Sequence, residues 1–287
     1  NSIPMQQFIN LNGKQVKADE PALFHNNRGF QYGDALFETM HANGKVIQFF
    51  DQHMQRLSRA MGMLKMEIPP KISGQTIENE IIRLLHKNRH LKGARVRLTV
   101  FRNPGGKYTP EDNSCSYLIE TSSLEHDTYQ LNDKGLFIDV FPGLKKPIHP
   151  LSNLKTTNDL IYVMAGIFKK EHRLDECLLL NEKDDITESI SSNVFMMYEG
   201  ELRTPPLASG CLEGIMREQI IECARALNIP LSDSQPLKLE DLMKAEEVFL
   251  TNAINGIQWV GGIRQKRFFK QTARKLLSVL NDKTAID

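Results

Sequence analysis

Hydrophobic and polar residues alternate along several short segments in the first half of the chain. The segment 94–101 alternates valine and leucine with arginine and threonine, which is typical of a strand with one buried face. Asn12-Gly13 and Asn43-Gly44 lie between such segments and favour tight hairpin turns. Hydrophobic residues recur at helical spacing from Asp51 to Leu64 and from Ile77 to Leu85. The expected strands of this half cover 7–15 (as a hairpin), 36–42, 45–49, 94–101 and 116–120.

Strands and helices alternate again after a polar stretch at 122–134. This stretch is the expected linker between two domains, 1–121 and 135–287. Because both halves mix strands with helices, the chain is predicted to have an α+β fold. Further strands are expected at 136–140, 176–180, 194–198, 201–204 and 247–251, with helices at 159–170, at 215–227 and near the C-terminus.

Composition and charge limit the classes of partner. With 287 residues, 40% of them hydrophobic, and a formal net charge of +1, the chain has the composition of a globular protein without a global field for nucleic acid or anionic membranes. The four cysteines form no CxxC pair, so no metal site is expected. The first ten residues lack a signal-peptide pattern, and no window approaches about 20 apolar residues, so a cytoplasmic protein is expected.

Three segments of the second half carry groups that bind anions or move protons. Lys155 lies just before an expected helix, and Glu188 lies between two strands and is followed by hydroxyl residues and Asn193. A glycine-bounded turn opens a helix whose first N–H groups, at Ile215 and Met216, are available to a phosphate. Each segment alone is more typical of a solvated loop or an ordinary helix start, so only their combination is informative.

Five segments of the chain combine in one order: Asn27–Thr39, His53–Leu57, Leu154–Asn158, Thr187–Phe195 and Gly214–Arg217. That order resembles the class IV aminotransferase family, which has fold type IV of the pyridoxal-5′-phosphate (PLP) enzymes. The family contains branched-chain and D-amino acid aminotransferases and aminodeoxychorismate lyase, and the resemblance covers nearly the whole chain. It implies a smaller N-terminal α/β sandwich and a C-terminal pseudo-barrel, as in D-amino acid aminotransferase, with PLP bound between them in a homodimer.

The resemblance also assigns roles to individual residues. It implies that Lys155 carries PLP as a Schiff base and then moves the substrate α-proton as acid and base. Glu188 matches the partner of the pyridinium nitrogen, and Arg56 matches the arginine that binds the cofactor phosphate. The other cofactor-binding residues that it implies are Asn193, Ile215, Met216 and Asn252.

Three positions depart from the aminotransferase pattern and leave two reactions open. Hydroxyl residues are common in aminotransferases where this chain has Met216 and Ala253, and branched-chain aminotransferases have tyrosine where it has Leu160. These departures resemble aminodeoxychorismate lyase, whereas Phe-Glu-Thr at 37–39 resembles the aminotransferases. The first hypothesis is amino transfer between an amino acid, branched-chain or related, and a 2-oxo acid. The alternative is cleavage of 4-amino-4-deoxychorismate to 4-aminobenzoate and pyruvate.

Either reaction requires a cationic group for the substrate carboxylate. Arg95 and Arg97 lie two apart on an expected strand, so both project from one face, which is either solvated or substrate-facing. Arg97 aligns better with a substrate-side position of the family. Tyr32 falls where the family has an active-site aromatic residue, and Tyr108 lies in a glycine-rich loop and is a candidate gate residue.

A basic stretch from Arg264 to Lys275, interleaved with two phenylalanines, supports a remote third hypothesis, a non-enzymatic binding module. The simpler, purely structural alternative is a terminal helix with one solvated face. Its buried face would contain Phe269, Leu276, Leu277 and Leu280.

Overall fold

The computed structural model describes residues 6–44 and 46–285, which group into two compact units. The first unit contains the described residues up to Thr128 together with Lys155–Asn158, and the second contains Tyr129–Leu154 and the described residues from Asp159 onward. Lys45, where one expected strand begins, and the first five residues, where no signal peptide is expected, lie outside the described residues. The domain limits drawn from the sequence stay a prediction.

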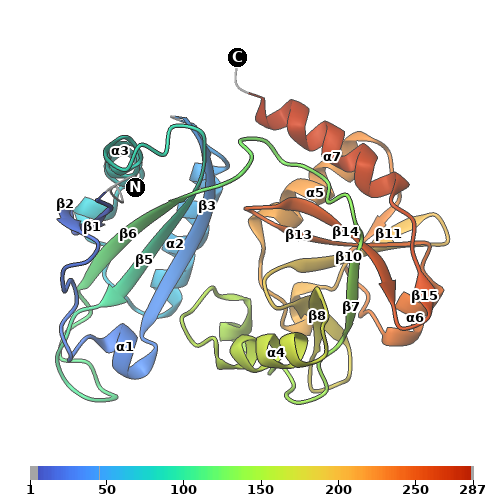
Figure 1. Ribbon diagram of the computed structural model, residues 1–287. Helices are drawn as coiled ribbons and strands as arrows, with labels where there is room; N and C mark the ends of the chain where they lie inside the picture. The colour runs from blue at the N-terminus through green and yellow to red at the C-terminus, as the bar shows by residue number, and fades with distance from the viewer. Residues whose placement is uncertain (1–5, 45, 286–287) are drawn as a thin grey trace. The chain divides into compact units, whose positions relative to one another are not determined.

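Within the residues described for the first unit, a six-stranded sheet carries two long helices on one face (Figure 1). Its elements are β1 (Phe8–Leu11), β2 (Lys14–Lys17), α1 (Arg28–Tyr32), β3 (Ala35–Asn43), β4 (Val46–Ile47), α2 (Phe50–Met63), η1 (Pro70–Ile72), α3 (Gly74–Lys87), β5 (Gly93–Arg102) and β6 (Cys115–Ser123). The strand order is β2-β1-β6-β5-β3-β4, and every pairing within it is antiparallel. Both expected hairpins form, so the two Asn-Gly turns were informative.

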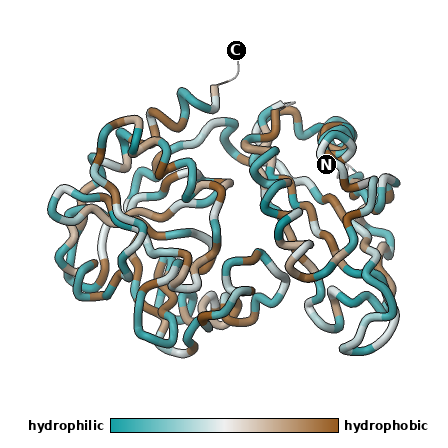
Figure 2. The backbone as a smooth tube through the Cα atoms, turned by 180° about the vertical axis from the view of Figure 1, so that it is seen from behind, coloured by the Kyte–Doolittle hydropathy of each residue, from teal (hydrophilic) through white to brown (hydrophobic). Residues whose placement is uncertain are grey.

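Alternation along β3 and β5 separates a buried face from a more open one. Met40, Val96 and Leu98 are fully buried on the face that α2 and α3 cover. Arg95 and Arg97 are half-buried and lie on the opposite face, as their spacing predicts. In Figure 2 hydrophobic and hydrophilic positions alternate along the backbone of both units.

The second unit contains a curled mixed sheet of nine strands among its described residues (Figure 1). Its elements are β7 (Leu136–Val140), η2 (Pro150–Asn153), α4 (Leu160–Glu171), β8 (Glu176–Leu180), β9 (Ile186–Ser189), β10 (Asn193–Tyr198), β11 (Glu201–Arg203), η3 (Leu207–Ser209), α5 (Ile215–Ala226), β12 (Leu231–Ser232), α6 (Leu239–Lys244), β13 (Glu247–Asn252), β14 (Gly256–Ile263), β15 (Lys266–Arg267) and α7 (Gln271–Thr284). The strand order is β12-β11-β10-β13-β14-β7-β8-β9, and β15 pairs with β14. Stacked rings of Phe195 and Phe249, 5.3 Å apart, belong to its core. No helix in the described part of the chain has the length and apolar character needed to cross a membrane.

The basic stretch near the C-terminus differs from its prediction. Arg264 adopts a left-handed turn and β15 follows it, so only the last part of the stretch is helical. Phe269 precedes α7, where its N–H donates to Glu246 O, and it is 68% exposed. Its expected place in the buried face was therefore wrong. The three leucines of that face, Leu276, Leu277 and Leu280, are buried as expected.

Candidate active site

Lys155 is held at the edge of the first unit's sheet, beside the start of β3. Its carbonyl accepts a hydrogen bond from Phe37 N at 2.9 Å, and Thr157 N donates to Ala35 O at 3.1 Å. The segment thus pairs with β3 as a short extra strand. The Lys155 amine lies 4.3 Å from the centroid of the Phe37 ring. This pairing fixes the direction of the amine, which a flexible loop would not do.

A glycine is required where this segment contacts α1. Gly33 ends α1 with a φ of 65°, which favours glycine, and a Cβ there would lie 2.7 Å from Asn158 Oδ1. Asn158 Nδ2 donates to Gly33 O at 3.0 Å. The Gln-Tyr-Gly-Asp run and the Lys155 segment, far apart in the sequence, therefore depend on each other.

Arg97 reaches the same aromatic ring as Lys155. Its guanidinium carbon lies 3.8 Å from the Phe37 centroid, so two cations contact one ring on the face opposite the helices. Arg95 shares that face but pairs with His41, one step further along β3. The structure therefore brings Arg97, and not Arg95, to the ring that Lys155 contacts.

Arg56 is anchored by a buried carboxylate. Its Nε and Nη2 donate to the two oxygens of Glu38 at 2.9 and 2.5 Å, and His53 Nδ1 lies 2.7 Å from Glu38 Oε2. Burial alone would raise the pKa of Glu38, but the Arg56 charge and the His53 hydrogen bond hold it at about 2. Burial lowers the pKa of His53, and the charges of Arg56 and Lys155 lower it further. The pairing holds the guanidinium in a fixed orientation.

Glu188 lies in β9 of the second unit and accepts three hydrogen bonds. Lys146 Nζ and the Tyr162 hydroxyl, the latter at 2.6 Å, donate to Oε1, and Leu212 N donates to Oε2 at 2.6 Å. Burial, followed by the Glu188 charge, raises the pKa of Tyr162, so its hydroxyl remains a donor. An ionised carboxylate has about four acceptor positions, so one remains for a further N–H donor.

The N-terminus of α5 is open to an anion. Gly214 is its N-cap, and no side chain of the described residues caps this end. The first N–H groups, at Ile215 and Met216, have no acceptor within the helix. Asn193 braces the turn, since its Nδ2 donates to Leu212 O at 2.9 Å and a Cβ on Gly214 would overlap its Oδ1. Backbone donors and the positive end of the helix dipole therefore converge here.

Asn252 organises the turn between β13 and β14. Its Oδ1 accepts hydrogen bonds from Ile254 N and Asn255 N at 3.0 and 2.8 Å, and its Nδ2 donates to Ser192 Oγ at 2.9 Å. Thr251 pairs with Asn193 across β10 and β13, so this turn and the Asn193 side chain belong to one corner of the second unit.

Tyr32 and Tyr108 lie together in the first unit. Their ring centroids are 5.6 Å apart, and Tyr108 is 91% exposed. The buried Arg28 side chain stacks on Tyr32 at 4.9 Å and donates to the carbonyls of Gly105 and Lys107, which fixes the loop before Tyr108. The glycine-rich loop is thus tied to α1, with an exposed aromatic residue at its tip.

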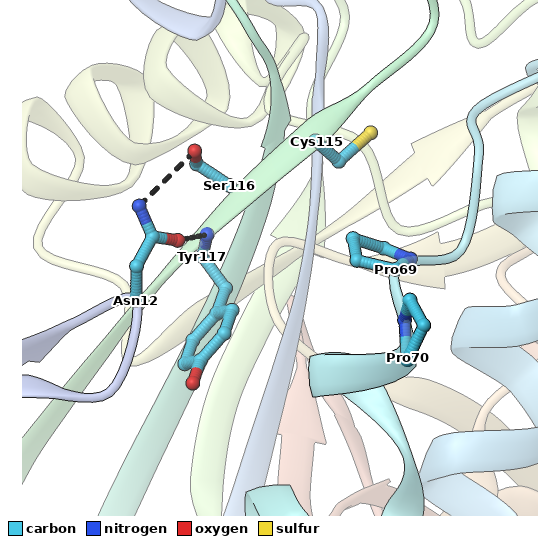
Figure 3. Close-up of a pocket in the computed structure, with 6 residues that line it drawn as sticks. All are labelled: Asn12, Pro69, Pro70, Cys115, Ser116 and Tyr117. Atoms are coloured by element: carbon cyan, nitrogen blue, oxygen red, sulfur yellow. Dashed lines mark hydrogen bonds between the residues drawn. The ribbon is translucent and has the colours of Figure 1, made fainter.

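A separate hollow of about 420 Å³ lies on the first unit (Figure 3). Asn12 and Cys115 already have partners: Asn12 Nδ2 donates to Ser116 Oγ, Asn12 Oδ1 accepts from Tyr117 N, and Cys115 Sγ donates to Asn113 O. Burial raises the pKa of Cys115 to about 12, so the thiol is protonated at neutral pH. None of the expected site residues lines this hollow, and it offers no group for the expected chemistry.

Sequence reasoning gave no role to Glu38, Lys146 or Tyr162. Glu38 had a signal, because it occupies a position of β3 whose neighbours in the alternation are Leu36 and Met40. Lys146 had none, since it lies in an irregular segment 42 residues before its partner Glu188.

Comparison with known proteins shows the family to which this chain is similar. Residues 35–263 match the model of a family described as amino-transferase class IV. The chain is similar to aminodeoxychorismate lyase of Bacillus subtilis, with 27% identity over 86% of this chain and 83% of the relative. It is also similar to a branched-chain-amino-acid aminotransferase of Salmonella typhimurium, with 24% identity over 90% of this chain and 86% of the relative.

The fold is shared with solved structures. The branched-chain aminotransferase of Thermoproteus uzoniensis superposes with a TM-score of 0.86 at 22% identity, covering 96% of this chain and 93% of the other. The expected α+β fold of this group and the resemblance drawn from the five segments are confirmed.

The anchored Glu38 predicts a specific acid sensitivity. Its pKa falls from 4.5 to about 2 on folding, so its contribution to stability is present above pH 4.5 and is lost as the pH falls toward 2. Over this window the unfolding free energy of the wild type should drop by on the order of 3 kcal/mol more than that of Glu38→Gln. Urea unfolding followed by circular dichroism at several pH values measures this difference.

Glu20→Gln is the matched control, because Glu20 is exposed and pairs only with an exposed lysine in the described structure. It should retain the pH profile of the wild type. Parallel profiles for wild type and Glu38→Gln would contradict the assignment of a buried, ionised Glu38.

Proposed function

This chain belongs to the class IV aminotransferase family of PLP-dependent enzymes, and from that membership we propose that it is an aminotransferase that holds PLP on Lys155. When bound, PLP supplies an aldehyde that condenses with amines and a ring that withdraws electrons from the substrate α-carbon. The residues of this chain have to hold the phosphate, the ring nitrogen and the substrate, and to move one proton.

The donor groups of the chain fit the parts of PLP. The dianionic phosphate suits the N–H groups of Ile215 and Met216 at the uncapped start of α5, and it suits the guanidinium of Arg56, which Glu38 orients. The protonated ring nitrogen suits the acceptor position left on Glu188. Asn193 and Asn252 would act by bracing the two turns of that corner.

The observation that carries the proposal is the meeting of Lys155 and Arg97 at Phe37. An amine that attacks the aldehyde and a guanidinium that binds a carboxylate lie against one ring, 4.3 and 3.8 Å from its centroid. In this proposal Arg97 binds the substrate carboxylate. The Lys155 amine would accept the proton of the substrate α-carbon and deliver it to the PLP carbon that carries the aldehyde group. Tyr32 and Tyr108 are proposed to cover the substrate.

A lyase reaction is the second candidate. Met216 is buried at the start of α5 and Ala253 lies in the turn after β13, so neither offers a hydroxyl to the phosphate. The similarity to aminodeoxychorismate lyase of Bacillus subtilis gives this candidate independent support. Both reactions use the same groups for the cofactor and differ in the substrate that they accept.

A substrate panel separates the two reactions. Purified protein with PLP is supplied with branched-chain L-amino acids or D-alanine plus 2-oxoglutarate, and separately with 4-amino-4-deoxychorismate. We expect glutamate and a new 2-oxo acid from the first set. Pyruvate and 4-aminobenzoate from the second reaction, without amino transfer in the first, would replace the aminotransferase proposal with the lyase.

Substitution of the two arginines tests the substrate site in the same panel. Loss of a charged hydrogen bond costs about 1.5–3 kcal/mol, so Arg97→Met should raise KM for the amino donor roughly 10- to 100-fold. Arg95→Met, on the same face of β5, is the matched control and should change KM little. The reverse pattern would move the carboxylate site to Arg95.

We further propose that the protein assembles as a homodimer and acts in the cytoplasm. The support for assembly is an exposed apolar stripe on α4. Such a stripe at helical spacing is typical of an interaction surface, and a self-complementary one suits a twofold dimer. Its residues are Leu160, Val163, Met164 and Ile167, which are 78%, 53%, 45% and 46% exposed.

Charge placed in the stripe is expected to break the dimer. Light scattering after size exclusion should give twice the mass of one chain for the wild type and the monomer mass for Val163→Lys combined with Ile167→Lys. Ser278→Lys, an exposed position of α7, is the control and should remain dimeric. A dimer that survives the double change places the interface elsewhere.

A further inference from the structure

A second lysine, Lys146, contacts the carboxylate that is proposed to face the ring nitrogen of PLP. Its Nζ pairs with Glu188 Oε1, and the Lys146 and Glu188 residues are only 4% and 3% exposed. Lysine is rarely buried to this degree without a partner of opposite charge. The burial of Lys146 is therefore explained by its ion pair with Glu188, and we ask what this pair does for the proposed cofactor.

Backbone contacts hold Lys146 in place beside Glu188. Its N–H donates to Leu180 O at 2.8 Å, and the residue bridges to Asn181 beside β8. The centroid of the Tyr162 ring lies 5.6 Å from the Lys146 Nζ. Lys146 is thus fixed beside the end of β8, next to Glu188.

The three donors of Glu188 differ in kind. Tyr162 and the N–H of Leu212 donate as neutral groups, whereas Lys146 donates as a cation. Burial disfavours the charged form of a carboxylate, and hydrogen bonds from neutral donors offset part of that cost. An opposite charge in contact with the carboxylate offsets more of it, because it attracts the anion directly.

We propose that Lys146 is a positioning residue that keeps Glu188 an oriented anion, so that the proton between Glu188 and the pyridine nitrogen of PLP stays on the nitrogen. The proposal rests on the proposed cofactor. Without the Lys146 charge, the proton would move from nitrogen to a Glu188 oxygen, leaving a neutral ring and a neutral carboxylic acid. No other bond changes in this transfer. A neutral ring withdraws electrons less strongly, so Lys146 would tune the cofactor without touching substrate.

The nitrogen shift of bound PLP reports the position of this proton directly. Holoprotein is prepared with PLP labelled with ¹⁵N in the ring, and its ¹⁵N spectrum is recorded for the wild type, Lys146→Met and Lys146→Arg. We expect a protonated-nitrogen shift in the wild type, displacement toward unprotonated pyridine in Lys146→Met, and the wild-type value in Lys146→Arg. The PLP dissociation constant of Lys146→Met should also rise about tenfold, since a charged hydrogen bond is replaced by a neutral one.

Lys145→Met is the matched control. Lys145 is the adjacent residue and pairs with Asp184, whose side chain is 72% exposed. Removing its charge should leave the ¹⁵N shift and PLP affinity unchanged. An equal effect in both variants would show a general response to lost positive charge and would overturn the proposal.

Tyr162→Phe separates charge from hydrogen bonding. It removes a neutral donor from the same oxygen, so it should move the ¹⁵N shift much less than Lys146→Met does. If Lys146→Met does not fold, Lys146→Gln keeps a polar group of similar length and gives the same comparison. A wild-type ¹⁵N shift in the neutral variant would refute the role of Lys146. A wild-type protein that binds no PLP would instead refute the proposed function.

Discussion

Two backbone hydrogen bonds hold the Lys155 segment against the first residues of β3, and the candidate chemistry depends on them. They join Phe37 N to Lys155 O and Thr157 N to Ala35 O. Because side chains alternate along a strand, this pairing sends the Lys155 amine to the Phe37 face, where Arg97 also lies. Lys155 was one of 36 basic residues in the sequence, and its surroundings distinguish it.

Both units use the same physical device to hold a functional group. Glu38 and Glu188 are buried carboxylates, each stabilised by a cation and by a further side-chain hydrogen bond. A buried ion pair contributes little net stability, because desolvation of the charges offsets their attraction, but removing one partner is costly. Such pairs are therefore suited to fixing geometry. Glu38 fixes a guanidinium and Lys146 fixes a carboxylate.

Much of the fold and part of the site were predictable from local patterns. The strand at Glu176–Leu180 has the predicted limits, and the helix α5 begins at the predicted residue, Ile215. Both were predictable because hydrophobic periodicity and the Gly-bounded turn are local signals. The β9 and β14 strands gave no such signal, since neither alternates clearly. The Lys146–Glu188 pair joins residues 42 apart, and only the folded sheet brings them together. The partners of a functional residue are set by tertiary structure, whereas its chemical type is visible in the sequence.

Chemical trapping of the cofactor tests the central claim most directly. Protein loaded with PLP is reduced with borohydride, digested and analysed by mass spectrometry to find the lysine that carries the phosphopyridoxyl group. The account predicts the label on Lys155 and its loss in Lys155→Ala. A label on Lys146 in the wild type, or undiminished labelling of Lys155→Ala, would contradict it.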